Sequence, residues 1–134
     1  MSHEILHPKT WAAARGYANG VAAQGRMVFT GGLIGWNAEQ QFTSDDFVDQ
    51  VAQALRSIVE VLACAGAKPE HLVRLTWYVT DKQEYLANLK GLGAVYKEII
   101  GRHYPAMALV QVVALVEDRA KVEIEATAVI PEAQ

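Results

Sequence analysis

Polar side chains capable of chemistry alternate with apolar ones in two segments of the sequence. Glu123, Glu125 and Thr127 alternate with apolar residues near the end of the chain, and Arg74, Thr76 and Tyr78 do so in the middle. In an extended strand this alternation separates a polar face from an apolar face. A carboxylate on such a face can orient or deprotonate water. The alternative is two solvated carboxylates, although subunit packing with polar pockets explains this face better than free solvent.

Other potentially reactive side chains form no recognisable cluster. His3, His7 and His71 are scattered, and none has an identifiable partner that would orient it as a base. The single cysteine, Cys64, cannot form an intramolecular disulfide, and no His/Cys cluster has the spacing of zinc ligands. We expect no metal and no cofactor, and we expect Cys64 to be a small buried thiol on a helix.

Two tryptophans are candidates for stacking on a planar ligand. Trp36 lies in a polar stretch that is typical of a loop, whereas Trp77 occupies an apolar position of an alternating segment. An aromatic residue at such a position more often belongs to the core, so each tryptophan has a binding and a packing interpretation.

The stretch from Tyr104 to Val116 is the most apolar part of the chain. Its residues favour a strand, and its lack of alternation predicts a strand buried on both faces. A small domain rarely covers both faces by itself, so a second chain is implied. The start of this strand, Tyr104-Pro105-Ala106-Met107, is then a candidate rim of a cleft between subunits.

Two helices are predicted, and they can cover one face of the sheet. The first opens at Thr43–Asp46 with a pattern resembling a capping box and ends before Gly66. The second follows Asp81 and ends at Gly101. Apolar residues recur at helical spacing in both segments: Phe47, Val51, Leu55, Ile58 and Leu62 in the first, and Tyr85, Leu89, Leu92, Tyr96 and Ile99 in the second.

The remaining segments predict strands. His3–Leu6 is a possible edge strand, and the runs 17–24 and 27–34 around Gly25-Arg26 predict a β-hairpin. Gly31-Gly32 predicts a bulge or bend within the second run. The segment 122–130 is predicted to return as a hairpin from the strand at 104–116. The expected order is β-β-β-α-β-α-β-β, an α+β arrangement.

Length and composition exclude several classes of protein. With 134 residues and 51% hydrophobic residues, the chain fits one domain over residues 1–134. It has no run of about 18 apolar residues that would span a membrane, and its polar start does not resemble a secretory signal. A cytoplasmic protein is expected. A net charge of −3 with scattered basic residues predicts no nucleic-acid binding.

Several short motifs, in this order and spacing, resemble the Rid family, also called the YjgF or RidA-like family and often labelled endoribonuclease L-PSP. The resemblance covers nearly the whole chain, roughly Tyr17 to Val129. The motifs are Gly16-Tyr17-Ala18-Asn19-Gly20-Val21, Val28-Phe29-Thr30-Gly31-Gly32, Ala63-Cys64-Ala65-Gly66-Ala67, Val79-Thr80-Asp81, Tyr104-Pro105-Ala106 and Val122-Glu123-Ile124-Glu125-Ala126.

The resemblance implies a chorismate-mutase-like α+β fold, a mixed sheet with two helices packed on one face, and a homotrimer with clefts between subunits. It implies that Glu123 orients a water that hydrolyses an enamine or imine to a keto acid and ammonia. The residues expected to line this cleft are Tyr17, Thr30, Gly31, Gly32, Trp36 and Met107. The alternative for Tyr17 is packing at the subunit boundary.

This sequence departs from the family pattern at the position that follows Pro105-Ala106. Deaminating members carry there an arginine that grips the substrate carboxylate, whereas this chain has Met107. Gly31 and Leu33 replace polar residues of the family pattern, and Gly93 replaces an asparagine. The cleft is therefore expected to be more apolar, and Arg102 is one residue that could supply a cation from another direction.

Three functions follow as expectations. The first is a trimer that binds or hydrolyses a small enamine- or imine-type metabolite without an arginine at position 107. The second is a noncatalytic small-molecule-binding or regulatory trimer. The third is a ribonuclease, which rests on the family label alone.

Overall fold

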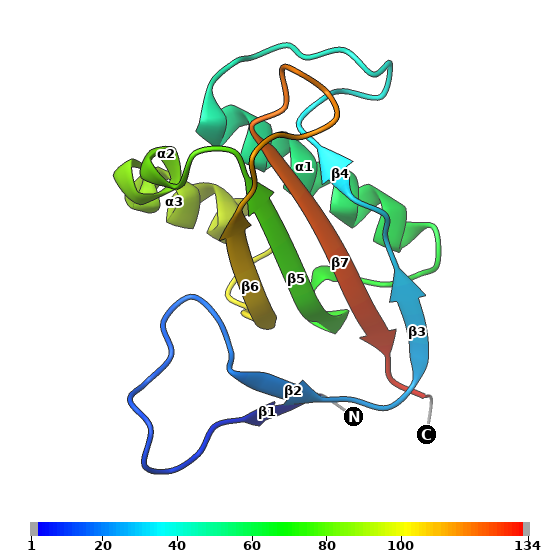
Figure 1. The fold of residues 1–134 in the computed structure, drawn as a ribbon. Helices are drawn as coiled ribbons and strands as arrows, with labels where there is room; N and C mark the ends of the chain where they lie inside the picture. The colour runs from blue at the N-terminus through cyan, green and yellow to red at the C-terminus, as the bar shows by residue number, and fades with distance from the viewer. Residues whose placement is uncertain (1–2, 133–134) are drawn as a thin grey trace.

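The longest helix, α1 (Phe47–Ala63), packs on one face of the sheet (Figure 1). Its buried side chains include those of the apolar stripe: Phe47, Val51, Leu55, Ile58 and Leu62. The structure is a computed structural model that describes residues 3–132. Asp46 caps the helix by accepting a hydrogen bond from the Asp49 N–H at 3.0 Å. The predicted capping role of Thr43 is therefore wrong, because the carboxylate of Asp46 already occupies that place. Gly66 adopts φ +77° after the helix, as predicted. The predicted burial of Cys64 is wrong, because this residue follows the last turn of α1 and its side chain is exposed.

The second helical segment is divided in two. Asp81 caps α2 (Lys82–Ala87) by accepting from the Gln83 N–H at 2.9 Å, and α3 (Leu89–Ile99) follows directly. Asn88 separates them with φ −122° and ψ 20°. Its side-chain amide donates to the Glu84 carbonyl at 2.6 Å, a bond that stabilises the end of α2. The cap was predicted correctly, but the single helix was not.

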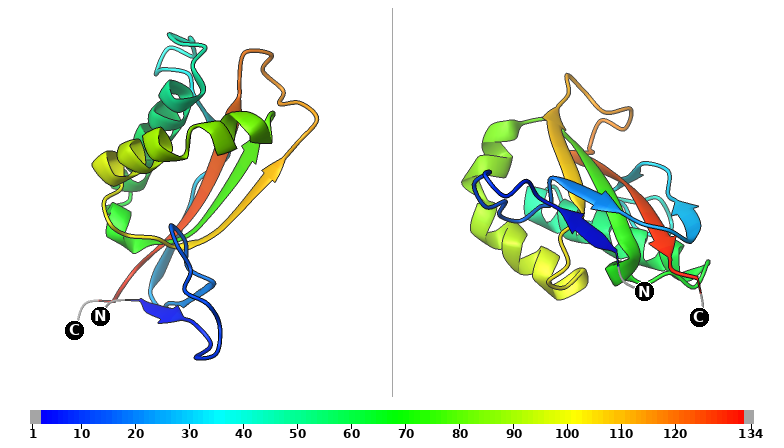
Figure 2. Two further views of the ribbon diagram at one scale, coloured as in Figure 1. Left: turned by 90° about the vertical axis from the view of Figure 1, so that its left-hand side faces the viewer. Right: turned by 90° about the horizontal axis from the view of Figure 1, so that it is seen from below.

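A mixed sheet of five strands forms the second layer. Its strands are β3 (Arg26–Phe29), β4 (Leu33–Ile34), β5 (Leu72–Val79), β6 (Ala106–Gln111) and β7 (Val122–Ile130). They run in the order β3-β7-β5-β6, and β4 also pairs with β7. Only the β5–β6 pair is parallel. The helices lie on one face of this sheet (Figure 2), which confirms the α+β class and the helical cover on one side.

The predicted hairpin between segments 17–24 and 27–34 is wrong. β2 (Gly20–Ala22) pairs instead with β1 (Glu4–Leu6) in a separate two-stranded ribbon below the sheet (Figure 1). The second segment pairs with β7, whose nine residues offer a longer partner than β2 does. It divides at Gly31-Gly32 into β3 and β4, so the predicted interruption is confirmed.

The predicted hairpin between β6 and β7 is also wrong. β6 follows β5 through the two helices and pairs with it in parallel, as a crossover connection requires. β7 therefore occupies the other side of β5 and pairs with it in antiparallel register. The strand at 104–116 is shorter than predicted, because β6 ends at Gln111.

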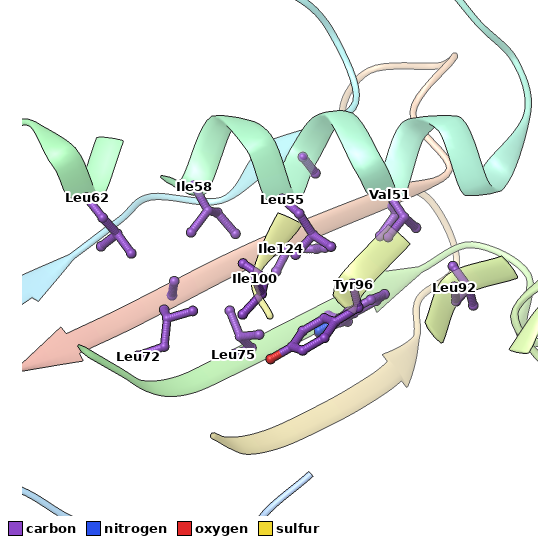
Figure 3. Close-up of a cluster of buried hydrophobic side chains, with 14 of the residues drawn as sticks. Val51, Leu55, Ile58, Leu62, Leu72, Leu75, Leu92, Tyr96, Ile100 and Ile124 are labelled. Atoms are coloured by element: carbon purple, nitrogen blue, oxygen red, sulfur yellow. The ribbon is translucent and has the colours of Figure 1, made fainter. Parts of the chain in front are cut away.

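The core lies between α1, α3 and the sheet. Figure 3 shows Leu55 and Ile58 of α1 pointing toward Leu75 of β5 and Ile124 of β7. All four side chains are fully buried. The stripe predicted for α1 is thus the core-facing stripe.

The opposite face of the sheet, here called the open face, has no helix over it. Arg74, Thr76 and Tyr78 of β5 share it with Glu123, Glu125 and Thr127 of β7, as predicted. Large apolar side chains are also exposed here: Phe29 is 64% exposed and Val110 is 45% exposed. β6 is therefore covered by its own chain on one face only, and its burial by a second chain stays a prediction.

No helix within residues 3–132 is long and apolar enough to cross a membrane.

Candidate functional site

A pocket of about 370 Å³ lies between β6 and α3, on the helix-covered side of the sheet. We call it the Tyr17 pocket, because Tyr17 lies on the loop that joins it from the N-terminal part of the chain. Its lining consists of Arg15, Gly16, Tyr17, Trp77, Tyr85, Leu89, Leu92, Gly93, Tyr96, Tyr104, Met107 and Leu109. Apolar and aromatic side chains dominate this lining, as in most sites for small organic ligands.

Strand register places the sheet side of the pocket. Met107 lies opposite Leu75, and Leu109 lies opposite Trp77, so both β6 side chains share the face that the helices cover. Leu92 and Tyr96 are the buried residues of α3 and approach the pocket from the other layer. The pocket therefore occupies the part of the interlayer space next to the edge strand β6.

The loop that carries Tyr17 is attached directly to β6. The Ala18 N–H donates to the Pro105 carbonyl at 3.0 Å, and Ala18 forms a parallel bridge with Ala106. Gly16 has φ +77°, a conformation that residues with a side chain rarely adopt. This turn and this anchor bring Tyr17 beside the start of β6.

Aromatic contacts hold the pocket walls. Tyr96 stacks on Tyr104 with ring centroids 5.3 Å apart, and Trp77 meets Tyr85 edge-on at 6.3 Å. The Tyr96 hydroxyl donates to the His103 carbonyl at 2.6 Å, and burial raises the pKa of this hydroxyl well above its usual value. The hydroxyl of Tyr96 is therefore a neutral, occupied donor with a structural role.

A second group of predicted residues lies on the open face. Glu123 is paired with Tyr78 on one side and with Ile34 on the other. A methyl group added to Gly32 would stand 2.0 Å from Glu123 Oε2, so the carboxylate packs directly against the Gly32 backbone. The absence of a side chain at Gly32 thus makes room for the Glu123 carboxylate.

Tyr78 and Glu125 form a hydrogen bond next to Glu123. This bond raises the pKa of the Tyr78 hydroxyl, because the neutral phenol donates to the carboxylate; burial and the charges of Glu125 and Glu123 raise it further. Glu125 is thus engaged, whereas Glu123 has no hydrogen-bond partner among the described residues. Of the two carboxylates, Glu123 is the one available to a water molecule or ligand.

The predicted site residues therefore divide into two groups on opposite faces of one sheet. Tyr17 and Met107 line the Tyr17 pocket, whereas Gly32 and Glu123 lie together on the open face. Gly31 is exposed next to Gly32. One protomer alone does not bring Glu123 to Met107.

Two other predicted residues are not part of the Tyr17 pocket lining and have packing roles within the chain. The Thr30 hydroxyl accepts from the Ala126 N–H at 2.9 Å and donates to the Gly31 carbonyl at 2.8 Å, so it replaces a backbone partner in the sheet. Trp36 follows β4 and packs on Phe42 with ring centroids 5.9 Å apart. Both side chains are accounted for by the fold.

The structure also locates the remaining candidates, Trp77, Arg102 and His103. Trp77 is buried, in agreement with its packing interpretation, and it also lines the Tyr17 pocket; its stacking on a ligand stays a prediction. Arg102 is exposed and is not part of the pocket lining. The His103 ring nitrogen Nε2 lies 2.7 Å from the Leu72 carbonyl, a contact that attaches the start of the β6 segment to β5.

Sequence reasoning missed Arg15 as a pocket residue and treated Tyr85 and Tyr96 as ordinary helix stripe. The available signal was their aromatic character, because tyrosines replace aliphatic residues in the stripe of the second helical segment. A second hollow, of about 490 Å³, lies beside residues 113–121 and contains none of the predicted residues. No group of three His, Cys, Asp or Glu residues within 3–132 could hold a metal ion.

Known proteins resemble this chain over most of its length. The family model described as Endoribonuclease L-PSP matches residues 8–130. The putative reactive intermediate deaminase TdcF of Escherichia coli is 32% identical over 116 residues, which cover 84% of this chain and 85% of TdcF. The 2-iminobutanoate/2-iminopropanoate deaminase of Salmonella typhimurium is 31% identical over 132 residues, which cover 96% of this chain and 98% of the deaminase.

Solved structures of related proteins also resemble this chain over most of its length. The conserved Rid-family protein YyfB of Yersinia pestis, whose function is unknown, superposes with a TM-score of 0.86 at 30% identity, covering 97% of this chain and all of YyfB. Escherichia coli TdcF with bound serine superposes with a TM-score of 0.67 at 30% identity, covering 95% and 98% of the two chains. The chain therefore belongs to the Rid family, the YjgF/RidA-like proteins also described as endoribonuclease L-PSP.

Proposed function

We propose that the protein binds a small enamine- or imine-type metabolite in a cleft that two copies of the chain build together. The observation that carries this proposal is the division of Tyr17 and Met107 from Gly32 and Glu123 onto opposite faces of the sheet. Two subunits packed side by side would bring the pocket of one to the carboxylate of the next. Relatives named as deaminases of reactive intermediates and of 2-imino acids support this class of ligand.

The chemistry that best fits the open-face cluster is hydrolysis of a carbon–nitrogen double bond. Glu123 would accept a proton from a water molecule while the water oxygen bonds to the imine carbon. Proton transfer to nitrogen and cleavage of the carbon–nitrogen bond would then release ammonia and leave a carbonyl product. Glu123 suits this role because its neighbour Glu125 is already bonded to Tyr78.

Deamination that depends on an arginine at position 107 is not expected. Met107 offers no charge-assisted hydrogen bond to a carboxylate, and loss of such a bond costs roughly 1.5–3 kcal/mol. Short 2-imino acids that bind with the carboxylate against Met107 should therefore be poor substrates. Larger or less polar imines fit the aromatic lining better.

Ammonia release tests the catalytic version. The purified protein is mixed with freshly generated 2-aminoacrylate and with a panel of imines of increasing apolar size, and Glu123→Gln is compared with Glu60→Gln, a change on the exposed side of α1. We expect release above buffer for the larger imines, a loss in Glu123→Gln and no loss in Glu60→Gln. Release at the buffer rate across the panel, unaffected by Glu123→Gln, would reject hydrolysis.

A noncatalytic binding protein is the second candidate, favoured by a pocket lining without any Asp, Glu or His. A thermal-shift screen distinguishes it, since a ligand at about 100-fold its dissociation constant stabilises the fold by about 2.7 kcal/mol. Stabilisation without turnover would support this reading. A ribonuclease has no comparable support in an acidic chain with a pI near 5.8, and nuclease-free protein should leave RNA intact.

A further inference from the structure

We propose that Arg15 binds the anionic group of the ligand in the Tyr17 pocket, and that this ligand is a small carboxylate with an aromatic or branched apolar body. The inference rests on the proposed function only in taking this pocket as the ligand site. It names the substrate class, and it assigns anion binding to the N-terminal loop in place of position 107 on β6.

The first argument is the charge of the lining. Arg15 is the one residue of the lining that carries a charge at neutral pH, because the others are glycines, aliphatic residues, Met107 and aromatic residues. The ion pairs within residues 3–132 are Arg119–Asp45 and Lys121–Glu84, so Arg15 has no carboxylate partner there. An unpaired guanidinium beside an apolar pocket suits an anion, and its fork of donors matches a carboxylate.

The second argument is the placement of Arg15. It immediately precedes Gly16, whose φ of +77° makes the turn, and Ala18 is hydrogen-bonded to Pro105 at 3.0 Å. The backbone on one side of Arg15 is therefore tied to the start of β6. Arg15 joins the pocket lining from the N-terminal loop, whereas Met107 joins it from the sheet, so the two positions can serve the two ends of one ligand.

The third argument concerns the pocket interior. Trp77 is 4% exposed and lines the pocket, and its indole N–H is the one buried side-chain donor without a hydrogen-bond partner within residues 3–132. A buried donor without a partner is costly, so sites of this kind commonly await a ligand atom or water. The five aromatic rings of the lining provide flat apolar surface for the body of the ligand.

Three test compounds separate charge from apolar contact. They are 3-phenylpropanoate, its neutral counterpart 3-phenylpropanamide, and propanoate, which keeps the carboxylate but lacks the ring. Binding is followed by Trp77 fluorescence in the Trp11→Phe/Trp36→Phe background, which leaves Trp77 as the single tryptophan of three. Calorimetry on the unaltered protein provides a second readout.

We expect 3-phenylpropanoate to bind at least about tenfold more tightly than the amide, the factor that a charge-assisted hydrogen bond supplies. It should also bind more tightly than propanoate, which lacks the apolar contact of the ring. Arg15→Gln should remove this advantage and leave the amide affinity unchanged. Arg15→Lys should retain part of it. Arg102→Gln, an exposed arginine outside the lining, should change nothing. Added salt should weaken binding of the acid more than binding of the amide.

The outcomes discriminate between the two proposals. Equal affinities for acid and amide, or an acid affinity unaffected by Arg15→Gln, would overturn the role of Arg15 and leave the pocket as a ligand site. Failure of all three compounds to bind at millimolar concentration would overturn both the role of Arg15 and the ligand class. The imine assay with Glu123→Gln tests hydrolysis separately, because it changes a residue on the other face of the sheet.

Discussion

The two faces of the five-stranded sheet differ in how far their own chain buries them. On the helix-covered face, Leu75 and Ile124 are fully buried by side chains of the same chain. On the open face, Phe29 and Val110 are exposed apolar residues beside the carboxylates of Glu123 and Glu125. The first face is complete in one protomer, whereas the second mixes exposed apolar area with groups that can do chemistry. The core of the protomer therefore lies on one side of the sheet, and its exposed apolar and acidic side chains lie together on the other.

The Tyr17 pocket is an exception to the complete burial of the helix-covered face. It lies on the helix-covered face, but at its margin, where β6 is the edge strand and the N-terminal loop replaces the next strand. Packing is therefore incomplete there, and aromatic side chains line the remaining space. The comparison between the faces can be tested with pairs of substitutions at neighbouring residues whose side chains lie on opposite faces of the sheet.

The largest effect is expected in the core. Leu75→Ala removes a fully buried side chain between β5 and α1 and should lower the free energy of unfolding by about 2–5 kcal/mol. Thr76→Ala changes the neighbouring residue on the open face and should cost less than about 1 kcal/mol. Urea denaturation measures both changes. Equal costs would contradict the division between the faces.

Self-association should depend on the open face. Phe29→Asp places a charge on an apolar side chain that is 64% exposed, so folding of the protomer should be little affected. If this face packs against a second copy in a homotrimer, the change should weaken association at least about tenfold, since a buried unpaired charge is costly. Sedimentation across micromolar concentrations measures this. A stable monomer of 14.7 kDa before any substitution would reject the trimer.

A smaller effect is expected at the contact of Gly32 with Glu123. Gly32→Ala would place its Cβ 2.0 Å from Glu123 Oε2, so the carboxylate must turn away. We expect about 1 kcal/mol of lost stability, the low end for overpacking, because a half-exposed side chain can move. If Glu123 acts on imines, their hydrolysis should fall as well. Gly31→Ala is the matched control, because its added Cβ would have no atom within 4 Å.

The smallest effect concerns two tyrosines on opposite faces. The pKa of Tyr78 is raised chiefly by its hydrogen bond to Glu125, whereas that of Tyr96 is raised chiefly by burial. Each tyrosine therefore stabilises the fold below pH 10 in its neutral form, and that contribution is lost as pH rises through the raised pKa. Glu125→Gln should move the Tyr78 titration back toward its ordinary value and leave Tyr96 unchanged. Phenolate absorbance during alkaline titration reports both.

Local sequence patterns predicted the elements and their buried faces. The spacing of Leu55 and Ile58 gave the stripe of α1 correctly, and the alternation around Tyr78 and Glu125 assigned the two faces of β5 and β7. These predictions succeeded because period and burial are coupled within each element. Strand pairing was predicted less well, because both predicted hairpins joined strands that are adjacent in sequence. In the structure β3 pairs with the distant strand β7, and β6 pairs with β5 across the two helices.

The candidate site shows the same limit. Tyr17 and Met107 were predicted as binding residues and Tyr104 as part of a cleft rim, and all three line the pocket, but Arg15 enters it through contacts that no local pattern encodes. Tyr96 illustrates the reason, since one side chain serves at once as core residue, stacking partner of Tyr104 and pocket wall. Periodicity detects burial and does not distinguish a filled interior from a lined cavity.

The position of β7 also has a consequence for how the chain folds. It is the last strand of residues 3–132, yet it has β5 on one side and β3 and β4 on the other. During synthesis the sheet cannot be completed until residues 122–130 have left the ribosome, and the pairing of β3 with β7 closes a loop of most of the chain. Such non-local pairing favours slow folding. A nascent chain that stops before Val122 exposes an edge of β5 to other chains, a recognised route to aggregation.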